Sequence, residues 1–276
     1  MLRTRLITAL VLLALLAAAS AWSATALLGL CAVLAAIGLY EWLRLAGFGA
    51  VGAAAAAVAF GATLAWTSVF QAGLAQATVA AVALIACAVW CALGVAVAAA
   101  DRGHARIGPA WSTALAAGLL WAGWIALASL LQRGVEWLVS VLAVVWVADI
   151  AAYFTGRALG RHKLAPRISP GKSWEGVWGA MASVVLLAWA VHRVWPDAPV
   201  WSNHVVSELT WPATVASLVS IVALSVVGDL FESLLKRQAG VKDSGWLLPG
   251  HGGVLDRIDA TLPTLPAALL IDWWTR

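Results

Sequence analysis

The sequence has very little charge. Only 11% of its 276 residues are Asp, Glu, Lys or Arg, whereas 63% are hydrophobic. A typical soluble domain is about a quarter charged and about half apolar. The apolar runs are long enough to cross a bilayer, and they lack the polar–apolar alternation of a membrane β-barrel. We therefore expect an all-α, polytopic membrane protein.

Cysteine is also scarce. Cys31 stands alone, and Cys87 and Cys91 lie four residues apart in an apolar run, without a CxxC pair or a neighbouring histidine. A zinc site needs four convergent ligands, so these residues do not indicate one. We expect them to serve as small residues of the helix packing.

Basic residues are distributed unevenly between the loops. If the N-terminus is cytoplasmic, 14 of the 17 Lys and Arg residues fall on the cytoplasmic side, and Arg133, Arg193 and Arg276 fall on the other. This is the pattern of the positive-inside rule. It predicts a multi-pass protein of the cell (inner, cytoplasmic) membrane with about nine transmembrane helices, at approximately 6–20, 22–40, 50–68, 74–99, 111–130, 137–156, 175–195, 212–235 and 261–275.

The first segment has two interpretations. Arg3 and Arg5, an apolar core and the run AAASAWSA resemble a secretory signal peptide with a cleavage site. The alternative is an uncleaved first helix that ends in a tight turn. We favour the helix, because its removal would place the later basic loops on the wrong side of the membrane.

The two halves of the chain differ in polarity. Residues 1–135 are mostly Ala, Leu, Val and Gly, which predicts helix packing and oligomer contacts with little chemistry. Residues 136–276 carry three polar clusters and are predicted to form a catalytic region with its site at the cytoplasmic face.

The first cluster is centred on Asp149. Asp149 and Tyr153 are four residues apart and share a helix face. A carboxylate deep in an apolar helix usually faces the bundle interior or a polar cavity. Either it belongs to a functional site or it pairs with an Arg or Lys of another helix.

The second cluster is the basic segment 157–176. A Pro-Gly turn precedes Ser173, which is suited to cap the next helix, and the start of that helix favours an anion. Gly171, Lys172 and Ser173 match the end of a Walker A loop, but Pro166 occupies the place of its first glycine. A phosphate-binding loop of another design is expected, with an ordinary positively charged loop as the alternative.

The third cluster is 228–259. Asp229, Glu232, Ser233 and Lys236 follow one helix face, and Gly228 permits close approach of another segment. A glycine-rich loop with further Asp, Lys and Arg residues follows. Carboxylates suit Mg²⁺, and Lys, Arg and glycine amides suit phosphate.

These residue types together indicate phosphoryl or nucleotidyl transfer between a soluble nucleotide and a lipid. Two alternatives stay open. A transporter would place its charges near the bilayer midplane with repeat symmetry. A CTP-using kinase of a polyprenol or phytol would need a base near a neutral hydroxyl. We expect no nucleic-acid partner.

The spacing within the third cluster is specific. From Ser233 to Asp259 the chain reads SLLKR, four residues, KD, five residues, and then PGHGGVLDRID. This series resembles the signature of the phosphatidate cytidylyltransferases, also called CDP-diacylglycerol synthases, and the first two clusters resemble upstream blocks of that family. The resemblance covers the C-terminal half.

The resemblance implies a Mg²⁺-dependent reaction of CTP with phosphatidic acid that gives CDP-diacylglycerol and pyrophosphate in phospholipid biosynthesis. It also implies a homodimer in the lipid bilayer, and it leaves a second, monovalent cation open. His251 is either part of the site or orders the loop. The implied residues are, as metal ligands, Asp229 and Asp256 with Asp243 and Asp259; as catalytic residues, Asp229, Lys236, Arg237, Asp243, Asp256 and Arg257; and, as substrate-binding residues, Asp149, Lys163, Ser169, Lys172, Ser173, Glu175, Ser233, Lys242, His251, Gly252 and Gly253.

Overall fold

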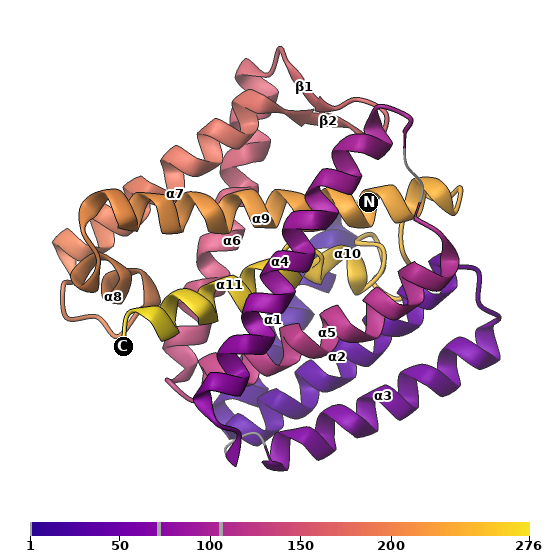
Figure 1. The fold of residues 1–276 in the computed structure, drawn as a ribbon, viewed down its shortest axis with the longest axis horizontal. Coiled ribbons are helices and arrows are strands. Elements are labelled where there is room, and N and C mark those ends of the chain that lie inside the picture. Colours follow the sequence, from indigo (N-terminus) through magenta and orange to yellow (C-terminus); the bar gives the residue numbers. More distant parts are fainter. Residues whose placement is uncertain (1, 71–72, 105–106) are drawn as a thin grey trace.

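The structure is a computed structural model that describes residues 2–70, 73–104 and 107–276. Figure 1 shows a bundle of long helices with one small hairpin at its edge. The elements are α1 (Leu2–Trp22), α2 (Ala24–Leu45), α3 (Ala50–Phe70), α4 (Gln76–Asp101), α5 (Pro109–Leu131), α6 (Val135–Leu159), β1 (Lys163–Ala165), β2 (Ser169–Ser173), α7 (Trp174–Val194), α8 (Trp201–Glu208), α9 (Trp211–Gln238), α10 (Leu255–Ile258) and α11 (Thr261–Trp274).

The all-α prediction is confirmed, and the chain is a multi-pass membrane protein. Within the described residues, seven helices are long and apolar enough to cross a bilayer: α2, α3, α4, α5, α6, α7 and α9. Nine spans are not shown. The first predicted span falls on α1, whose described side chains include the apolar stretch Leu10–Trp22 and which stays a prediction as a span, and α11, at the last predicted span, has only 14 residues. At 1.5 Å per residue α11 measures roughly 21 Å, against roughly 30 Å of hydrocarbon.

Helix α11 belongs to the protein core. Eight of its first nine residues are buried, including Pro263, Pro266 and Thr264, and it packs against α4, α5 and α9. Its neighbours come from both halves of the chain. The division into a packing half and a catalytic half stays a prediction, but the two halves pack together.

Small residues bring α6 and α7 into close contact. A Cβ atom on Gly176 would lie 2.8 Å from the carbonyl oxygen of Ala152, and one on Gly156 would lie 3.6 Å from the Cα of Gly176. Such contacts replace side-chain packing between membrane helices, as the Ala- and Gly-rich composition predicts. They fix the hairpin that connects these two helices.

Aromatic packing fixes the other side of α9. The ring of Phe231 lies 5.4 Å from Trp42 of α2 and 5.6 Å from Trp90 of α4, measured between centroids. All three side chains are fully buried. Offset and edge-to-face pairs of this kind add to the stabilisation from buried area. These contacts fix the position of α9 against α2 and α4, just before its polar residues Glu232, Ser233 and Lys236.

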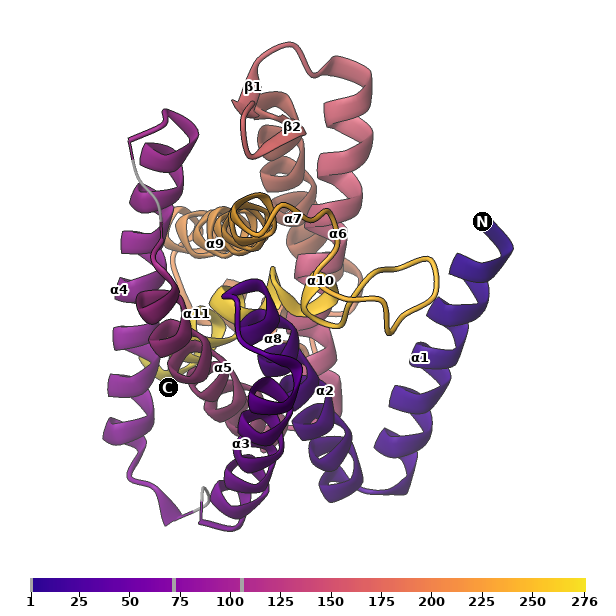
Figure 2. The same cartoon turned by 90° about the vertical axis from the view of Figure 1, so that its right-hand side faces the viewer.

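The connections that the charge pattern assigns to the cytoplasm lie at one end of the bundle (Figures 1 and 2). Asp101 at the end of α4 binds the backbone N–H groups of Arg167 and Ile168, at 2.8 and 3.2 Å. Thr8 of α1 donates to the carbonyl of Pro249. The start of α1 is therefore at the same end as the 239–254 loop. Arg3, Arg5 and Arg106, which the charge argument also uses, lie outside the described side chains.

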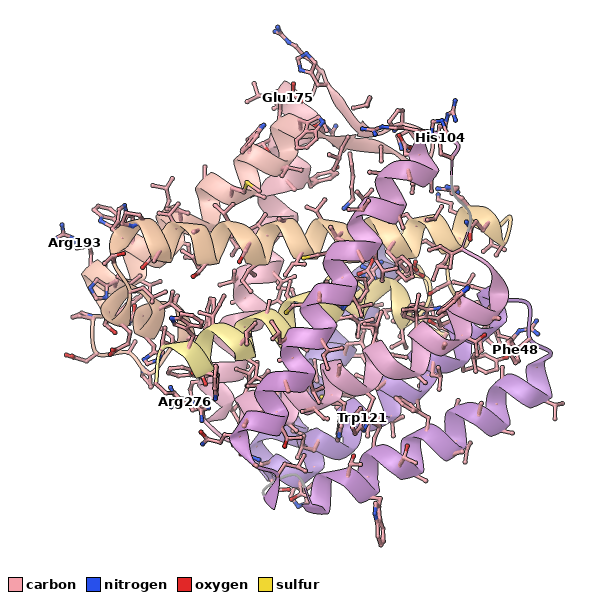
Figure 3. All side chains as sticks on the ribbon, viewed as in Figure 1. Phe48, His104, Trp121, Glu175, Arg193 and Arg276 are labelled. Carbon is pink, nitrogen blue, oxygen red and sulfur yellow. The ribbon has the colours of Figure 1, made fainter. Side chains whose placement is uncertain are left out.

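The opposite end carries the three exceptional arginines. Figure 3 places Arg193 and Arg276 away from His104 and Glu175, which lie near the hairpin end. Asp272 of α11 pairs there with Arg133 at 3.0 Å and with Arg276 at 2.8 Å. The grouping of basic residues at one end thus matches the sequence prediction, and the side of the membrane to which that end faces stays a prediction.

Candidate active site

The second and third polar clusters meet between β2 and α9. The ammonium Nζ of Lys172 lies 2.6 Å from Asp229 Oδ2, and the Ser233 hydroxyl donates to Asp229 Oδ1 at 3.3 Å. Lys172 and Asp229 keep 26% and 35% of their side chains exposed, so the pair is open to a solute. The hairpin places a cation directly over a carboxylate.

Two turns beyond Asp229 on α9, Lys236 lies between two carboxylates. It pairs with Glu232 on its own helix and with Asp256 Oδ1, the latter at 2.5 Å. Glu232 and Asp256 are nearly buried, at 3% and 6% side-chain exposure. The spacing of Asp229, Glu232, Ser233 and Lys236 on one face is confirmed.

The loop between α9 and α10 is folded around Asp256. Its Oδ2 accepts hydrogen bonds from the Ser244 amide (2.9 Å), the Ser244 hydroxyl (2.9 Å) and the Gly253 amide (2.8 Å). Burial opposes the charge of this carboxyl group, but the bond from Lys236 and these amides outweigh burial and lower its pKa to about 2. Asp256 is an anion at any physiological pH.

Glycines make room for this carboxylate. Gly252 has a φ of +83°, which favours glycine, and a Cβ there would lie 2.6 Å from Asp256 Oδ2. The isolated bridge between Leu248 and Gly252 closes the turn before it. The Gly252 and Gly253 positions therefore shape the Asp256 site.

Gly228 permits the approach that its sequence position suggested. A Cβ on it would overlap the carbonyl oxygen of Asp259 and would lie 2.9 Å from Pro263 Cγ. This contact brings the α10–α11 junction onto α9 and places Asp259 near Asp229. Burial and the neighbouring Asp229 raise the pKa of Asp259 well above its usual range.

Asp149 extends the site toward α6. It lies within electrostatic range of Lys172, Asp229 and Arg257 and keeps an exposed side chain on a membrane-spanning helix. Its neighbour Tyr153 accepts a hydrogen bond from Arg157 at 3.0 Å. All three polar clusters therefore converge on the region between α6, β2, α9 and α10.

The hairpin residues have mixed roles. The Ser173 hydroxyl caps α7 by accepting from the Gly176 amide at 3.2 Å, as its position predicted. Glu175 binds the ring and the backbone N–H of His162, at 2.7 and 3.2 Å, so its contacts order the turn before β1. Lys163 pairs in register with Ser173 and is exposed; Ser169 pairs in register with Ala165.

The remaining predicted residues lie at the rim. Arg237 donates to the carbonyl of Ile168 and links α9 to the hairpin. Lys242, Asp243 and Arg257 are exposed, and the His251 amide donates to the Leu248 carbonyl within the loop. Asp243 lies near Gly252, whereas Asp229, Asp256 and Asp259 lie deeper.

Sequence reasoning missed two residues of the first half. Asp101 binds the hairpin, and Glu41 of α2 is buried with 3% exposure against the 244–255 loop. Glu41 accepts from the Ser244 hydroxyl at 3.0 Å, the Val254 amide at 3.1 Å and the Leu255 amide at 2.7 Å. A lone carboxylate in an apolar helix was the available signal.

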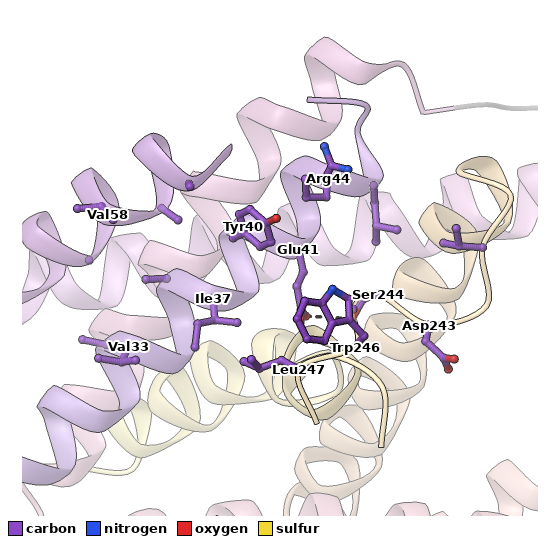
Figure 4. Close-up of a pocket in the computed structure, with 18 of the residues that line it drawn as sticks. Val33, Ile37, Tyr40, Glu41, Arg44, Val58, Asp243, Ser244, Trp246 and Leu247 are labelled. Carbon is purple, nitrogen blue, oxygen red and sulfur yellow. Dashed lines mark hydrogen bonds between the residues drawn. The ribbon is translucent and has the colours of Figure 1, made fainter. Parts of the chain in front are cut away.

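A groove of about 990 Å³ lies on the other side of this loop, between α2 and α3 (Figure 4). Its walls are mostly apolar, and Tyr40, Glu41 and Arg44 are the polar side chains that α2 contributes. The loop lines it with, among others, Asp243, Ser244 and Trp246. Asp229, Asp256 and Asp259 are not among its lining residues.

The carboxylates offer the hard oxygen donors that Mg²⁺ prefers. Among the described residues, no three His, Cys, Asp or Glu side chains are already arranged as ligands of one ion. Lysine ammonium groups lie instead against Asp229 and Asp256. The oxygen donors of these carboxylates fit a divalent cation. In this structure the ammonium groups of Lys172 and Lys236 supply the positive charge beside Asp229 and Asp256.

The fold and this site define a polytopic membrane protein with paired carboxylates and lysines at one end. The model of the cytidylyltransferase family matches residues 3–273. A phosphatidate cytidylyltransferase of Pseudomonas aeruginosa is 39% identical over 284 residues, which cover 99% of this chain and 97% of that protein. The chain belongs to the phosphatidate cytidylyltransferase family, as its Ser233–Asp259 series indicated.

Two further relatives match about half of the chain. Phosphatidate cytidylyltransferases of Haemophilus influenzae and Thermotoga maritima are 47% identical over 135 residues and 44% identical over 131 residues. These segments span 44% and 47% of the two proteins and 49% and 48% of this chain.

Proposed function

We propose that this chain transfers CMP from CTP to phosphatidic acid, giving CDP-diacylglycerol and pyrophosphate, between β2, α9 and α10. The observation that carries the assignment of the site is the pairing of Lys172 with Asp229 and of Lys236 with Asp256. These two pairs come from three separate segments of the chain.

The nucleophile of this reaction needs no base from the protein. The phosphomonoester of phosphatidic acid has a second pKa of about 6, so most of it is a dianion at neutral pH. The protein must instead hold two anions together and stabilise the charge on the leaving pyrophosphate. Lys172, Lys236 and the exposed Arg257 supply positive charge around the carboxylates, and Arg237 and Lys242 extend it to the rim.

Asp229 and Asp256 are the residues that would hold Mg²⁺, with Asp259 beside Asp229 and Asp243 at the rim. When bound, this ion would neutralise phosphate charge and orient the two substrates. Asp229 and Asp259 repel each other when both are charged, and a bound cation would relieve this repulsion. A monovalent ion at the same carboxylates and a homodimer through the membrane helices stay predictions.

The site end of the bundle faces the cytoplasm in this proposal, because most basic residues lie there. If α1 crosses the membrane with the seven long helices, eight crossings return the chain to its starting side. The bond from Thr8 to Pro249 supports this parity, since it joins the start of the chain to the site loop.

The test is transfer of label from CTP to lipid by purified protein in detergent micelles with phosphatidic acid and Mg²⁺. Label on the α-phosphate should enter the lipid phase, and EDTA should abolish the transfer. Label from the γ-phosphate should remain in water. Transfer of γ-label to a polyprenol, without α-label in lipid, would replace this proposal with the kinase alternative.

A further inference from the structure

We propose that Glu41 is a positioning residue for the reaction: it holds the 244–255 loop so that Asp256 is presented to the metal and substrates. This inference rests on the proposed function of Asp256. It assigns a role in catalysis to the N-terminal half of the chain.

Glu41 is an acidic residue within a largely apolar helix. It lies in α2 between Tyr40 and Trp42, in a membrane-spanning helix, and it is 3% exposed. A buried carboxylate at such a position is costly unless hydrogen bonds compensate for its lost hydration. The compensation comes from a segment more than 200 residues later in the chain.

The hydrogen bonds of Glu41 reach both ends of the loop. At the end of the loop, the Val254 amide donates to Oε1 at 3.1 Å and the Leu255 amide to Oε2 at 2.7 Å. Near its start, the Ser244 hydroxyl donates to Oε2 at 3.0 Å, and Figure 4 shows the Glu41 side chain directed at Ser244. One carboxylate therefore ties together the two ends of the loop that directly precedes Asp256.

Ser244 connects Glu41 to Asp256. Its hydroxyl lies 3.0 Å from Glu41 Oε2 and 2.9 Å from Asp256 Oδ2, and its amide also donates to Asp256. A hydroxyl has one hydrogen, so the two carboxylates share it. A change in the position of the loop at Glu41 is transmitted to the orientation of Asp256 through this residue.

Two loop glycines are explained by the same carboxylate. A Cβ on Gly245 would lie 2.8 Å from Glu41 Cδ, and one on Gly253 would lie 2.6 Å from it. The backbone is thus wrapped closely around the Glu41 side chain on both sides. Part of the glycine content of the loop serves this contact, and Gly252 serves Asp256 itself.

The experiment compares Glu41→Gln with wild type in two assays. Glutamine keeps the size but places an NH₂ group where the carboxylate accepts. Mutation of a group that orients a metal ligand typically lowers metal affinity or activity by about 10- to 100-fold. We expect a roughly 10-fold rise in the Mg²⁺ concentration for half-maximal CMP transfer and a lower kcat, and Glu41→Asp should restore part of both.

The second assay needs no metal and no turnover. Hydrogen exchange of the peptide that covers 240–255, measured by mass spectrometry in EDTA, should be faster in Glu41→Gln. Asp272→Asn is the matched control: it neutralises another buried carboxylate at the opposite end, and it should leave both the loop exchange and the Mg²⁺ requirement unchanged.

The outcomes separate the two proposals. Inactive wild-type protein with a folded thermal transition would overturn the proposed function. Active wild type with an unchanged Mg²⁺ requirement and unchanged loop exchange in Glu41→Gln would overturn the positioning role. If Glu41→Gln does not fold, Ser244→Ala tests the same connection and should raise the Mg²⁺ requirement in the same direction.

Discussion

Lys236 and Asp256 are joined by a contact of 2.5 Å between Nζ and Oδ1, across 20 residues that contain the glycine-rich loop. The contact closes the loop onto α9. It also places a cation and an anion with little solvent between them, because their side chains are 12% and 6% exposed. Each partner has a second role in the proposed reaction: Asp256 as a ligand of the metal and Lys236 as a contact of a phosphate.

Asp256→Asn should abolish most CMP transfer. The variant removes the charge that a divalent cation would bind, and it leaves the Ser244 and Gly253 amides with a weaker acceptor. We expect a fall in kcat of about 100-fold or more, as for the loss of a principal electrostatic group. Asp197→Asn, which neutralises an exposed aspartate beyond α7, is the control and should retain wild-type activity. Activity within a few-fold of wild type would remove Asp256 from the metal site.

Asp256 also predicts how stability changes with acid. Its pKa of about 2 in the folded chain lies below the ordinary 3.8, so its charge stabilises the fold above the ordinary value, and this contribution disappears as the pH falls toward 2. The contribution is about 2 kcal/mol at neutral pH. In EDTA, the difference in thermal midpoint between wild type and Asp256→Asn should be constant from about pH 8 to 5 and should shrink below about pH 4. A difference that shrinks near neutrality would contradict the assigned pKa.

Lys172→Met should weaken CTP binding more than it lowers kcat. If Lys172 contacts a nucleotide phosphate, its loss removes a charge-assisted hydrogen bond of about 1.5–3 kcal/mol, or roughly 10- to 100-fold in KM for CTP. Arg161→Met removes a positive charge from the same connection and serves as the control. Equal effects of the two variants would mean that the hairpin acts only through its overall charge.

Much of this site follows from local sequence. The helical spacing of Asp229 and Lys236 and the cap at Ser173 are set by neighbouring residues, and the glycine at 228 indicates room for another segment; the structure agrees with each. Long-range partners are different. Glu41 and Asp101 bind backbone N–H groups more than 60 residues away, and no spacing rule connects them to those groups.

The cost of burying charge in an apolar helix marks Asp149 as a functional candidate, and it holds equally for Glu41. Hydropathy alone also does not predict the length of α11. An apolar helix buried among its neighbours has the same composition as one that faces lipid, so 261–275 resembled a span.

Gly228→Ala tests whether the α10–α11 junction must touch α9. The added methyl group would overlap the Asp259 carbonyl oxygen and lie 2.9 Å from Pro263 Cγ, so the junction must move. Such overpacking costs about 1–3 kcal/mol of unfolding free energy. We expect Gly228→Ala to have a lower thermal midpoint than wild type and to lose more CMP transfer than the loss of folded protein alone would explain. Gly118→Ala, at a helical glycine whose Cβ would have nothing within 4 Å, should leave both unchanged. Full activity in Gly228→Ala would show that the Asp229–Asp259 approach is not required.

Asp272→Asn should separate stability from catalysis. Asp272 is fully buried and pairs with Arg133 and Arg276, whose side chains are 32% and 31% exposed. Breaking a buried pair by removing one partner is strongly destabilising, but both arginines here can regain hydration, so we expect a loss of about 2 kcal/mol.

The measurement is the thermal midpoint in detergent, beside the Mg²⁺ concentration for half-maximal transfer. The midpoint should fall and the Mg²⁺ requirement should not move, because the Arg133–Asp272–Arg276 cluster lies at the end of the bundle opposite the site. Glu208→Gln, at the exposed carboxylate that ends α8, should change neither quantity. A shift in the Mg²⁺ requirement of Asp272→Asn would mean that α11 transmits changes along its length to the Asp259 junction.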